Sequence, residues 1–160
     1  MRPIQSVCSP GCAYVEAKAQ QEKKDAKIKA AKKKDLMPKS EWVKLAQQVF
    51  NKFIRLRDQA KPCISCEAPL NGKFDAGHYF SCGAYPGLRF DEDNVHGQCV
   101  ACNQHRHGNI SEYVIRLPER IGLEAYEALQ SRRGQKCQYS IPELKELIES
   151  YKLKIKQLTP

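Results

Sequence analysis

The sequence lacks the features that mark several large classes of protein. It has no apolar run near 18 residues, the length needed to cross a membrane as a helix. Its N-terminus has no apolar stretch of the kind found in secretory signal peptides. It has no internal repeat and no glycine-rich loop for nucleotide phosphates. We therefore expect a protein that acts in the cytosol and not in a membrane.

Positive charge is present in excess and is unevenly distributed. The net charge of the 160 residues is +9. Residues 1–40 hold ten Lys or Arg against four Asp or Glu, and residues 41–160 hold seventeen against fourteen. A local excess of positive charge suits a polyanion, most simply nucleic acid, because Lys and Arg neutralise phosphates and release counterions.

Residues 14–39 form most of this basic segment. They are rich in Ala, Lys, Gln and Glu and contain neither Gly nor Pro before Pro38, so helix propensity is high. They have no apolar stripe, which predicts a solvated helix or a disordered arm. A solvated surface without a partner competes with DNA contact, and the excess of lysine favours DNA contact. The lysines predicted to bind DNA are Lys23, Lys24, Lys27, Lys32, Lys33 and Lys34.

The first packed helix is predicted at residues 40–59, with Ser40 as its N-cap. Apolar residues recur there every three to four positions, which predicts one buried face. This face comprises Trp42, Leu45, Val49, Phe53 and Leu56. Arg55 and Arg57 are assigned to other faces and are predicted to contact DNA phosphates.

The rest of the chain predicts a small α+β domain. Residues 73–80 follow an Asn-Gly turn and read as a strand, and residues 81–95 read as a loop. Helices are expected at 112–117, where Pro118 interrupts, and at 123–129. The final helix follows a capping box that begins at Ser140. Its packing stripe is Leu144, Leu147, Ile148, Tyr151, Ile155 and Leu158.

Four of the eight cysteines form two CxxC pairs. Two such pairs can close one tetrahedral zinc site, because thiolates two residues apart can both face one ion. The spacing, without a secretion signal, favours metal over disulfide bonds. The predicted ligands of a structural zinc ion are Cys63, Cys66, Cys99 and Cys102.

A third cysteine pair, Cys8 and Cys12, lies in residues 1–13. Its CxxxC spacing could be half of a metal site. Two unrelated thiols explain the spacing equally well, because no second pair is nearby.

All four histidines lie between residues 78 and 107. Zinc accounts for the cysteines and not for these imidazoles. A neutral imidazole can act as a general base, and a divalent ion held by Asn, His or Asp can stabilise a phosphoryl transition state. His78 is predicted to be such a base, with a structural or zinc-binding role as the alternative. His96 is expected to hydrogen-bond within a loop, and spacing does not separate His105 from His107.

The central segment resembles a known family. Cys63–Cys66, His78 in Ala-Gly-His-Tyr, Asn94, and Cys99–Cys102 followed at once by Asn103 are in the order of the HNH, or ββα-metal, nucleases. The resemblance is closer to the NinG (Rap) recombination proteins of lambdoid phages. It rests on Pro-Cys-Ile-Ser-Cys (62–66), Ala-Gly-His-Tyr (76–79) and Gln-Cys-Val-Ala-Cys-Asn-Gln-His (98–105).

This resemblance implies a structure-specific endonuclease for branched DNA, such as Holliday junctions and D-loops. The fold would be a small zinc-stapled ββα-metal core within residues 40–160, with flanking helices and a basic helical arm. His78 would activate water, and Asn94 would fix the loop behind it. Asn103, with His105 or His107, would hold a catalytic Mg²⁺ or Mn²⁺ ion.

The resemblance also implies a setting and partners. The protein would be a phage protein in the bacterial host cytosol, working with phage recombination proteins. A homodimer would suit a four-way junction, which offers two equivalent strands.

The sequence departs from the HNH pattern in two places. Many HNH nucleases have an acid directly before the base, and here that residue is Gly77. Asp75 is the nearest acid and only a weak candidate ligand of the catalytic ion, because in an ideal strand it faces away from His78 unless a bulge at Gly77 intervenes. In the family, an earlier CxxC pair accompanies a pair like Cys8 and Cys12. That earlier CxxC pair is absent from this sequence. These departures keep open the alternative of a non-catalytic zinc module that binds DNA and recruits recombination proteins.

Overall fold

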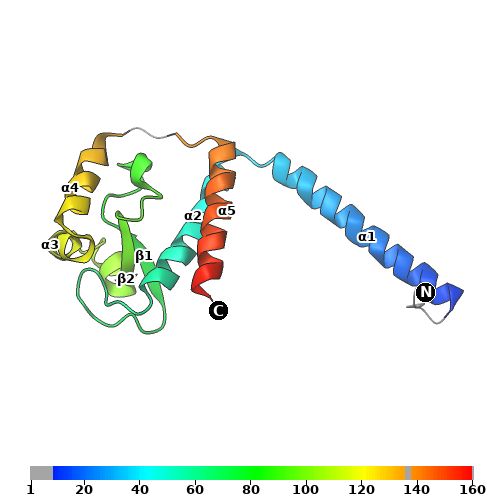
Figure 1. The fold of residues 1–160 in the computed structure, drawn as a ribbon, viewed down its shortest axis with the longest axis horizontal. Helices are drawn as coiled ribbons and strands as arrows, with labels where there is room; N and C mark the ends of the chain where they lie inside the picture. Colours follow the sequence, from blue (N-terminus) through cyan, green and yellow to red (C-terminus); the bar gives the residue numbers. More distant parts are fainter. Residues whose placement is uncertain (1–8, 136–137, 160) are drawn as a thin grey trace. The chain divides into compact units, whose positions relative to one another are not determined.

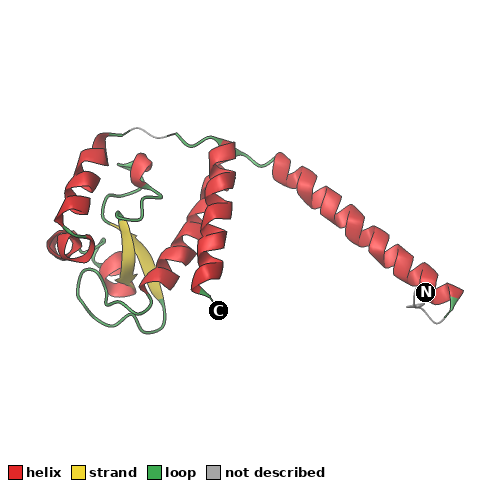
Figure 2. Ribbon diagram, viewed as in Figure 1, coloured by secondary structure: helices red, strands yellow, loops and turns green. Residues whose placement is uncertain are grey.

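The computed structural model describes residues 9–135 and 138–159, without the side chains of residues 30–35. The chain divides between Pro38 and Lys39 into two compact units, which we treat separately. Helices and one small two-stranded sheet make it an α+β protein, as expected (Figure 2). Within the described residues, no helix is both long and apolar enough to span a membrane.

The first unit contains helix α1 (Pro10–Asp35). The Ser9 hydroxyl accepts a hydrogen bond from the Cys12 backbone N–H at 3.2 Å and caps the helix. Its described side chains are exposed, including those of Lys23, Lys24 and Lys27. The basic segment is therefore a solvated helix. Cys8 and the side chains of Lys32, Lys33 and Lys34 lie outside the described part.

In the second unit, α2 (Lys39–Asp58) and α5 (Ile141–Leu158) pack side by side (Figure 1). The Phe50 and Tyr151 rings meet edge to face with centroids 5.0 Å apart. The predicted Ser140 capping box is present at the start of α5.

Two predictions about α2 were wrong. Helix α2 begins at Lys39, so Ser40 lies inside the helix and is not its N-cap. Leu45, Val49 and Leu56 are only partly buried, because the face turned toward α5 is rotated from the predicted stripe. The buried apolar residues of α2 are Trp42, Ala46, Phe50, Phe53 and Ile54.

Strands β1 (Phe74–His78) and β2 (Val95–Cys99) form an antiparallel hairpin. Its pairing runs without interruption from Phe74 opposite Cys99 to His78 opposite Val95, so no bulge lies at Gly77. Since side chains alternate along a strand, Asp75 and His78 belong to opposite faces of the hairpin.

Helices α3 (Ile110–Ile121) and α4 (Leu123–Ser131) cover a second apolar cluster beside the hairpin. Pro118 does not interrupt α3, contrary to the prediction, and the helix continues to Ile121. Pro118 removes one backbone hydrogen bond of the helix, and burial of Leu117 on the same helix offsets that loss. The cluster comprises Ile64, Phe80, Leu88, Tyr113, Leu117 and Leu129.

A buried ion pair ties α2 to the hairpin. The Asp58 carboxylate accepts hydrogen bonds from the Gly97 N–H at 2.8 Å and from Arg57 Nε at 2.9 Å. Arg57 also donates to the carbonyl oxygens of Glu92 and Val95. Burial alone would raise the pKa of Asp58, but these donors outweigh it and lower the pKa to about 2.

Candidate metal centre and active site

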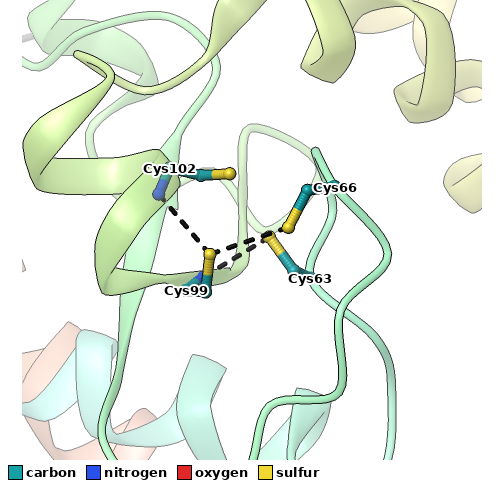
Figure 3. A group of neighbouring side chains, drawn as sticks. All are labelled: Cys63, Cys66, Cys99 and Cys102. Atoms are coloured by element: carbon teal, nitrogen blue, oxygen red, sulfur yellow. Dashed lines mark hydrogen bonds between the residues drawn. The ribbon is translucent and has the colours of Figure 1, made fainter.

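The four cysteines of the two CxxC pairs come together at one end of the hairpin (Figure 3). Their sulfur atoms all lie within 4.8 Å of one another, and Cys66 Sγ lies 3.7 Å from Cys99 Sγ. A tetrahedral zinc ion with Zn–S bonds of about 2.3 Å places its sulfurs about 3.8 Å apart. The donor set and its spacing fit zinc, and these cysteines could bind a structural zinc ion.

Backbone N–H groups point at the sulfur atoms. The Cys99 N–H donates to Cys63 Sγ and the Cys102 N–H donates to Cys99 Sγ, each at 3.4 Å. Such donors stabilise negative charge on sulfur, the form in which cysteine binds metal. Burial opposes this effect and raises the pKa of Cys99 and of Cys102, so a bound cation would be needed to hold all four cysteines as thiolates.

The buried Gln98 amide connects the two cysteine loops. Gln98 Nε2 donates to Ser65 Oγ at 2.7 Å and to the Gly108 carbonyl oxygen at 2.5 Å. Ser65 lies in the first cysteine pair, and Gly108 follows the second. The sequence analysis missed this residue, because its role depends on the strand register that places it opposite Asp75.

Asn103 follows the last cysteine and lies in a π-helical turn (Ala101–His105). Its Nδ2 donates to Asp75 Oδ2 at 3.0 Å, and Gln104 Nε2 donates to the same oxygen at 2.8 Å. Asp75, the acid nearest to the predicted base in sequence, thus contacts Asn103, although the bulge that would bring it to His78 is absent. A carboxylate and an amide oxygen are ligands that Mg²⁺ accepts.

His105 and His107 are exposed on the segment after Asn103. Across the described ranges, the four cysteines are the one group of three or more His, Cys, Asp or Glu side chains close enough to share an ion. His105 and His107 therefore do not both lie close enough to Asp75 to share an ion with it, and their metal-binding role stays a prediction.

His78 is held in a defined orientation at the end of β1. Its Nε2 lies 3.0 Å from the Arg89 carbonyl oxygen. A carbonyl only accepts, so Nε2 carries the proton and the lone pair is on Nδ1. Burial lowers the pKa of His78, which keeps the ring neutral at pH 7. A neutral, oriented imidazole has the properties of a general base.

The buried Asn94 side chain fixes the loop that carries Arg89. Asn94 Oδ1 accepts from the Phe80 N–H at 2.8 Å, and its Nδ2 donates to the carbonyl oxygens of Phe80 and Leu88 at 3.0 and 2.9 Å. The hydrogen bonds that the sequence analysis expected of Asn94 are present.

His96 lies in β2 and not in a loop, contrary to the prediction. It is buried, and its Nδ1 lies 3.2 Å from the Tyr113 hydroxyl. Burial, aided by the nearby Arg57 guanidinium, lowers the pKa of His96 to about 3. We assign it a structural role.

The buried, neutral His96 makes stability depend on pH. Its pKa is near 6.5 in the unfolded chain and about 3 in the folded chain, so the unfolded state binds more protons between these values. Its contribution is complete above pH 6.5 and is lost as the pH falls toward 3. At pH 5 we expect a loss of about 2 kcal/mol of unfolding free energy relative to pH 7 or above.

Urea denaturation of zinc-loaded protein across this range measures the effect. His96→Asn is the control. Between pH 7 and pH 5 its unfolding free energy should fall by about 2 kcal/mol less than that of wild type. Equal pH dependence of the two proteins would assign the titration to other groups, such as the cysteines.

Gly77, where an acid is expected, has no room for a side chain. A Cβ atom there would overlap the Gln98 amide and lie 3.0 Å from Gln98 Cβ. We therefore expect Gly77→Ala to reduce the unfolding free energy by about 1–3 kcal/mol through overpacking. Thermal melting checks this, with Gly83→Ala as the control, because no atom lies within 4 Å of a Cβ built at Gly83. A Gly77→Ala protein as stable as Gly83→Ala would show that Gln98 moves aside freely.

Arg57 does not fit its predicted role in DNA binding. Its guanidinium makes four hydrogen bonds to Asp58, Glu92 and Val95, and its side chain is only 20% exposed. The structure gives it the role of joining α2 to the hairpin. Arg55 is partly buried on the same helix and stays a predicted DNA contact.

The described residues thus form a small α+β protein with a cysteine centre suited to zinc beside an Asp75–Asn103 pair. Comparison with known sequences assigns the chain to a protein family. Residues 2–160 match the model of the family described as Bacteriophage Lambda NinG protein, and the chain belongs to this NinG family.

Curated relatives agree with this assignment. The chain is 46% identical over 123 residues to "Protein ninG" of Escherichia phage lambda and of Salmonella phage P22, and 45% identical to that of Escherichia phage 933W. The match covers 77% of this chain and 60–61% of each relative, so the chain spans about three fifths of their length. No solved structure matches the chain.

Proposed function

We propose that this chain is a metal-dependent endonuclease with an HNH-type site that hydrolyses phosphodiester bonds in branched DNA. The observation that carries the proposal is the Asp75–Asn103 contact directly beside the cysteine centre. A zinc ion on the four cysteines would fix the end of β2 and the turn that holds Asn103. Rigid support of this kind brings catalytic groups into productive geometry.

In the proposed reaction, metal binding and proton transfer are assigned to different residues. Asp75 and Asn103 would hold a divalent ion, which supplies charge stabilisation for the phosphate and the leaving oxygen. His78 Nδ1 accepts a proton from water, while the Nε2–H bond to Arg89 keeps the ring in the required tautomer. Asp75 lies near the start of β1 and His78 at its end, on opposite faces of the hairpin, so the proposal requires the substrate DNA to cross the strand to reach both residues.

The preference for branched DNA rests on the sequence resemblance. Exposed lysines of α1 support DNA binding in general, because phosphate contacts give affinity without reading sequence. We propose the host cytosol as the place of action.

A second function is a non-catalytic zinc module that binds DNA and recruits recombination proteins. The observation in its favour is Gly77, because the Gln98 amide fills the place of the acid that precedes the base in many HNH nucleases. Under this function the hydrogen bond between Asp75 and Asn103 would be structural only.

Purified, zinc-loaded protein with end-labelled DNA separates the two functions. A four-way junction, a three-stranded D-loop and a linear duplex of the same sequence are incubated with Mg²⁺, with Mn²⁺ and with neither. The proposal expects cleavage of the branched DNAs only when a divalent ion is added. Tight binding without cleavage under any of these ions would favour the module.

A further inference from the structure

A surface pocket of about 270 Å³ lies where the loop of the first cysteine pair meets the end of α3. It adjoins a second, open pocket of about 370 Å³, with which it shares Lys61 and Pro62. None of its residues belongs to the proposed active site. The pocket is lined by Lys61, Pro62, Glu67, Arg116, Glu119 and Arg120.

Its two arginines have incomplete hydrogen bonding. Arg116 Nη1 pairs with Glu67 at 2.7 Å, and Arg120 Nη2 donates to the Pro62 carbonyl oxygen at 3.1 Å. Arg116 Nε and Arg120 Nη1 are buried, and neither has a partner in the described part of the chain. A buried N–H without an acceptor keeps its full desolvation cost, so an acceptor brought to this pocket would be bound favourably.

The chemistry of the pocket selects an anion with several oxygens. Three cations, Lys61, Arg116 and Arg120, face two carboxylates, which leaves a positive balance. Arginine forks match the geometry of phosphate oxygens. The two unpaired N–H groups are covered by neighbouring atoms, so the guanidinium groups must turn to reach a ligand. Glu67 is 55% exposed, and its ion pair with Arg116 is therefore weak enough to open.

We propose that this pocket binds a backbone phosphate of DNA other than the phosphate that is cleaved. The proposal rests on the proposed function only for naming DNA as the source of the phosphate. Because such a contact reads no sequence or branch, it should strengthen the binding of junctions and of linear duplex alike.

Two measurements without any added divalent ion test the proposal on the zinc-loaded full chain. The first follows the arginine Nε–H NMR signals during titration with inorganic phosphate, with sodium chloride at matched ionic strength as the control. The signals of Arg116 and Arg120 should shift with phosphate and not with chloride. The second measures DNA affinity by fluorescence anisotropy between 50 and 200 mM salt.

Arg120→Gln and Arg116→Gln should each bind junction and duplex on the order of tenfold more weakly at 50 mM salt. The slope of log affinity against log salt should shrink by about 0.9 for each lost contact. Lys152→Gln, which removes an exposed cation of α5, should change neither quantity to this extent. Melting temperatures show whether each variant is folded.

Phosphate-dependent shifts without any loss of DNA affinity would overturn the DNA contact and leave a free-anion site. Absence of both effects would overturn the pocket as an anion site altogether. Neither result depends on cleavage, so a protein that binds through this pocket and never cuts would contradict the proposed function alone.

Discussion

Replacement of Cys102 with serine is expected to cost the protein its zinc ion and the fold around the hairpin. Structural zinc in small domains contributes about 10–16 kcal/mol of apparent binding free energy at pH 7. Whole domains are stable by only about 5–15 kcal/mol. Cys63 and Cys102 are buried in a small cluster with Leu70, so loss of the metal would disturb packing at this end of the hairpin.

Zinc content by mass spectrometry and thermal melting by near-UV circular dichroism measure this effect. Wild type should carry one zinc ion per chain on these four cysteines, and Cys102→Ser should carry none and lose its cooperative transition. Cys82→Ser is the matched control, because Cys82 lies outside the cluster and should keep both properties. A Cys102→Ser protein that lacks zinc and melts like wild type would exclude a zinc-dependent fold, and one that retains zinc would show that Cys102 is not a required ligand.

Replacement of His78 with glutamine is expected to reduce the rate of junction cleavage by about 10²–10⁴-fold, the usual contribution of a general base. The glutamine amide can still donate to the Arg89 carbonyl oxygen, so the loop should keep its place. It cannot take a proton from water at neutral pH. Single-turnover cleavage of a labelled four-way junction in Mg²⁺ gives the rate.

DNA affinity without divalent ion should be unchanged in His78→Gln, which separates catalysis from binding. His78→Ala leaves a space where imidazole was, and added imidazole should restore part of its rate. Cleavage by His78→Gln at the wild-type rate would show that another group activates the water.

The four candidate zinc ligands could be predicted from the sequence because each CxxC pair depends on local spacing alone. Local geometry brings together the two sulfurs within each CxxC pair, and the fold brings the two pairs together. The capping box of α5 was predictable for the same reason, since Ser140 and Glu143 lie within one turn. Within each CxxC pair and within the capping box, the residues that interact are close in the chain.

Features that depend on packing and register could not be predicted in this way. Asp75 reaches Asn103 because an uninterrupted hairpin places it on the face turned toward the segment after Cys102. An acidic side chain at position 77 would overlap the buried Gln98 amide, which belongs to the other strand. Likewise Arg57 looked like a surface cation until the structure placed Asp58 and the β2 carbonyl of Val95 around it.

The Mg²⁺ dependence of single-turnover junction cleavage by Asp75→Ala tests the central claim most directly. Gln104→Ala is the matched control, because it also removes one hydrogen bond to the same carboxylate oxygen and keeps the carboxylate and Asn103. The account predicts that Asp75→Ala keeps its zinc and its DNA affinity yet does not cut at any Mg²⁺ concentration, while Gln104→Ala cuts. Wild-type cleavage with an unchanged Mg²⁺ dependence in Asp75→Ala would contradict it.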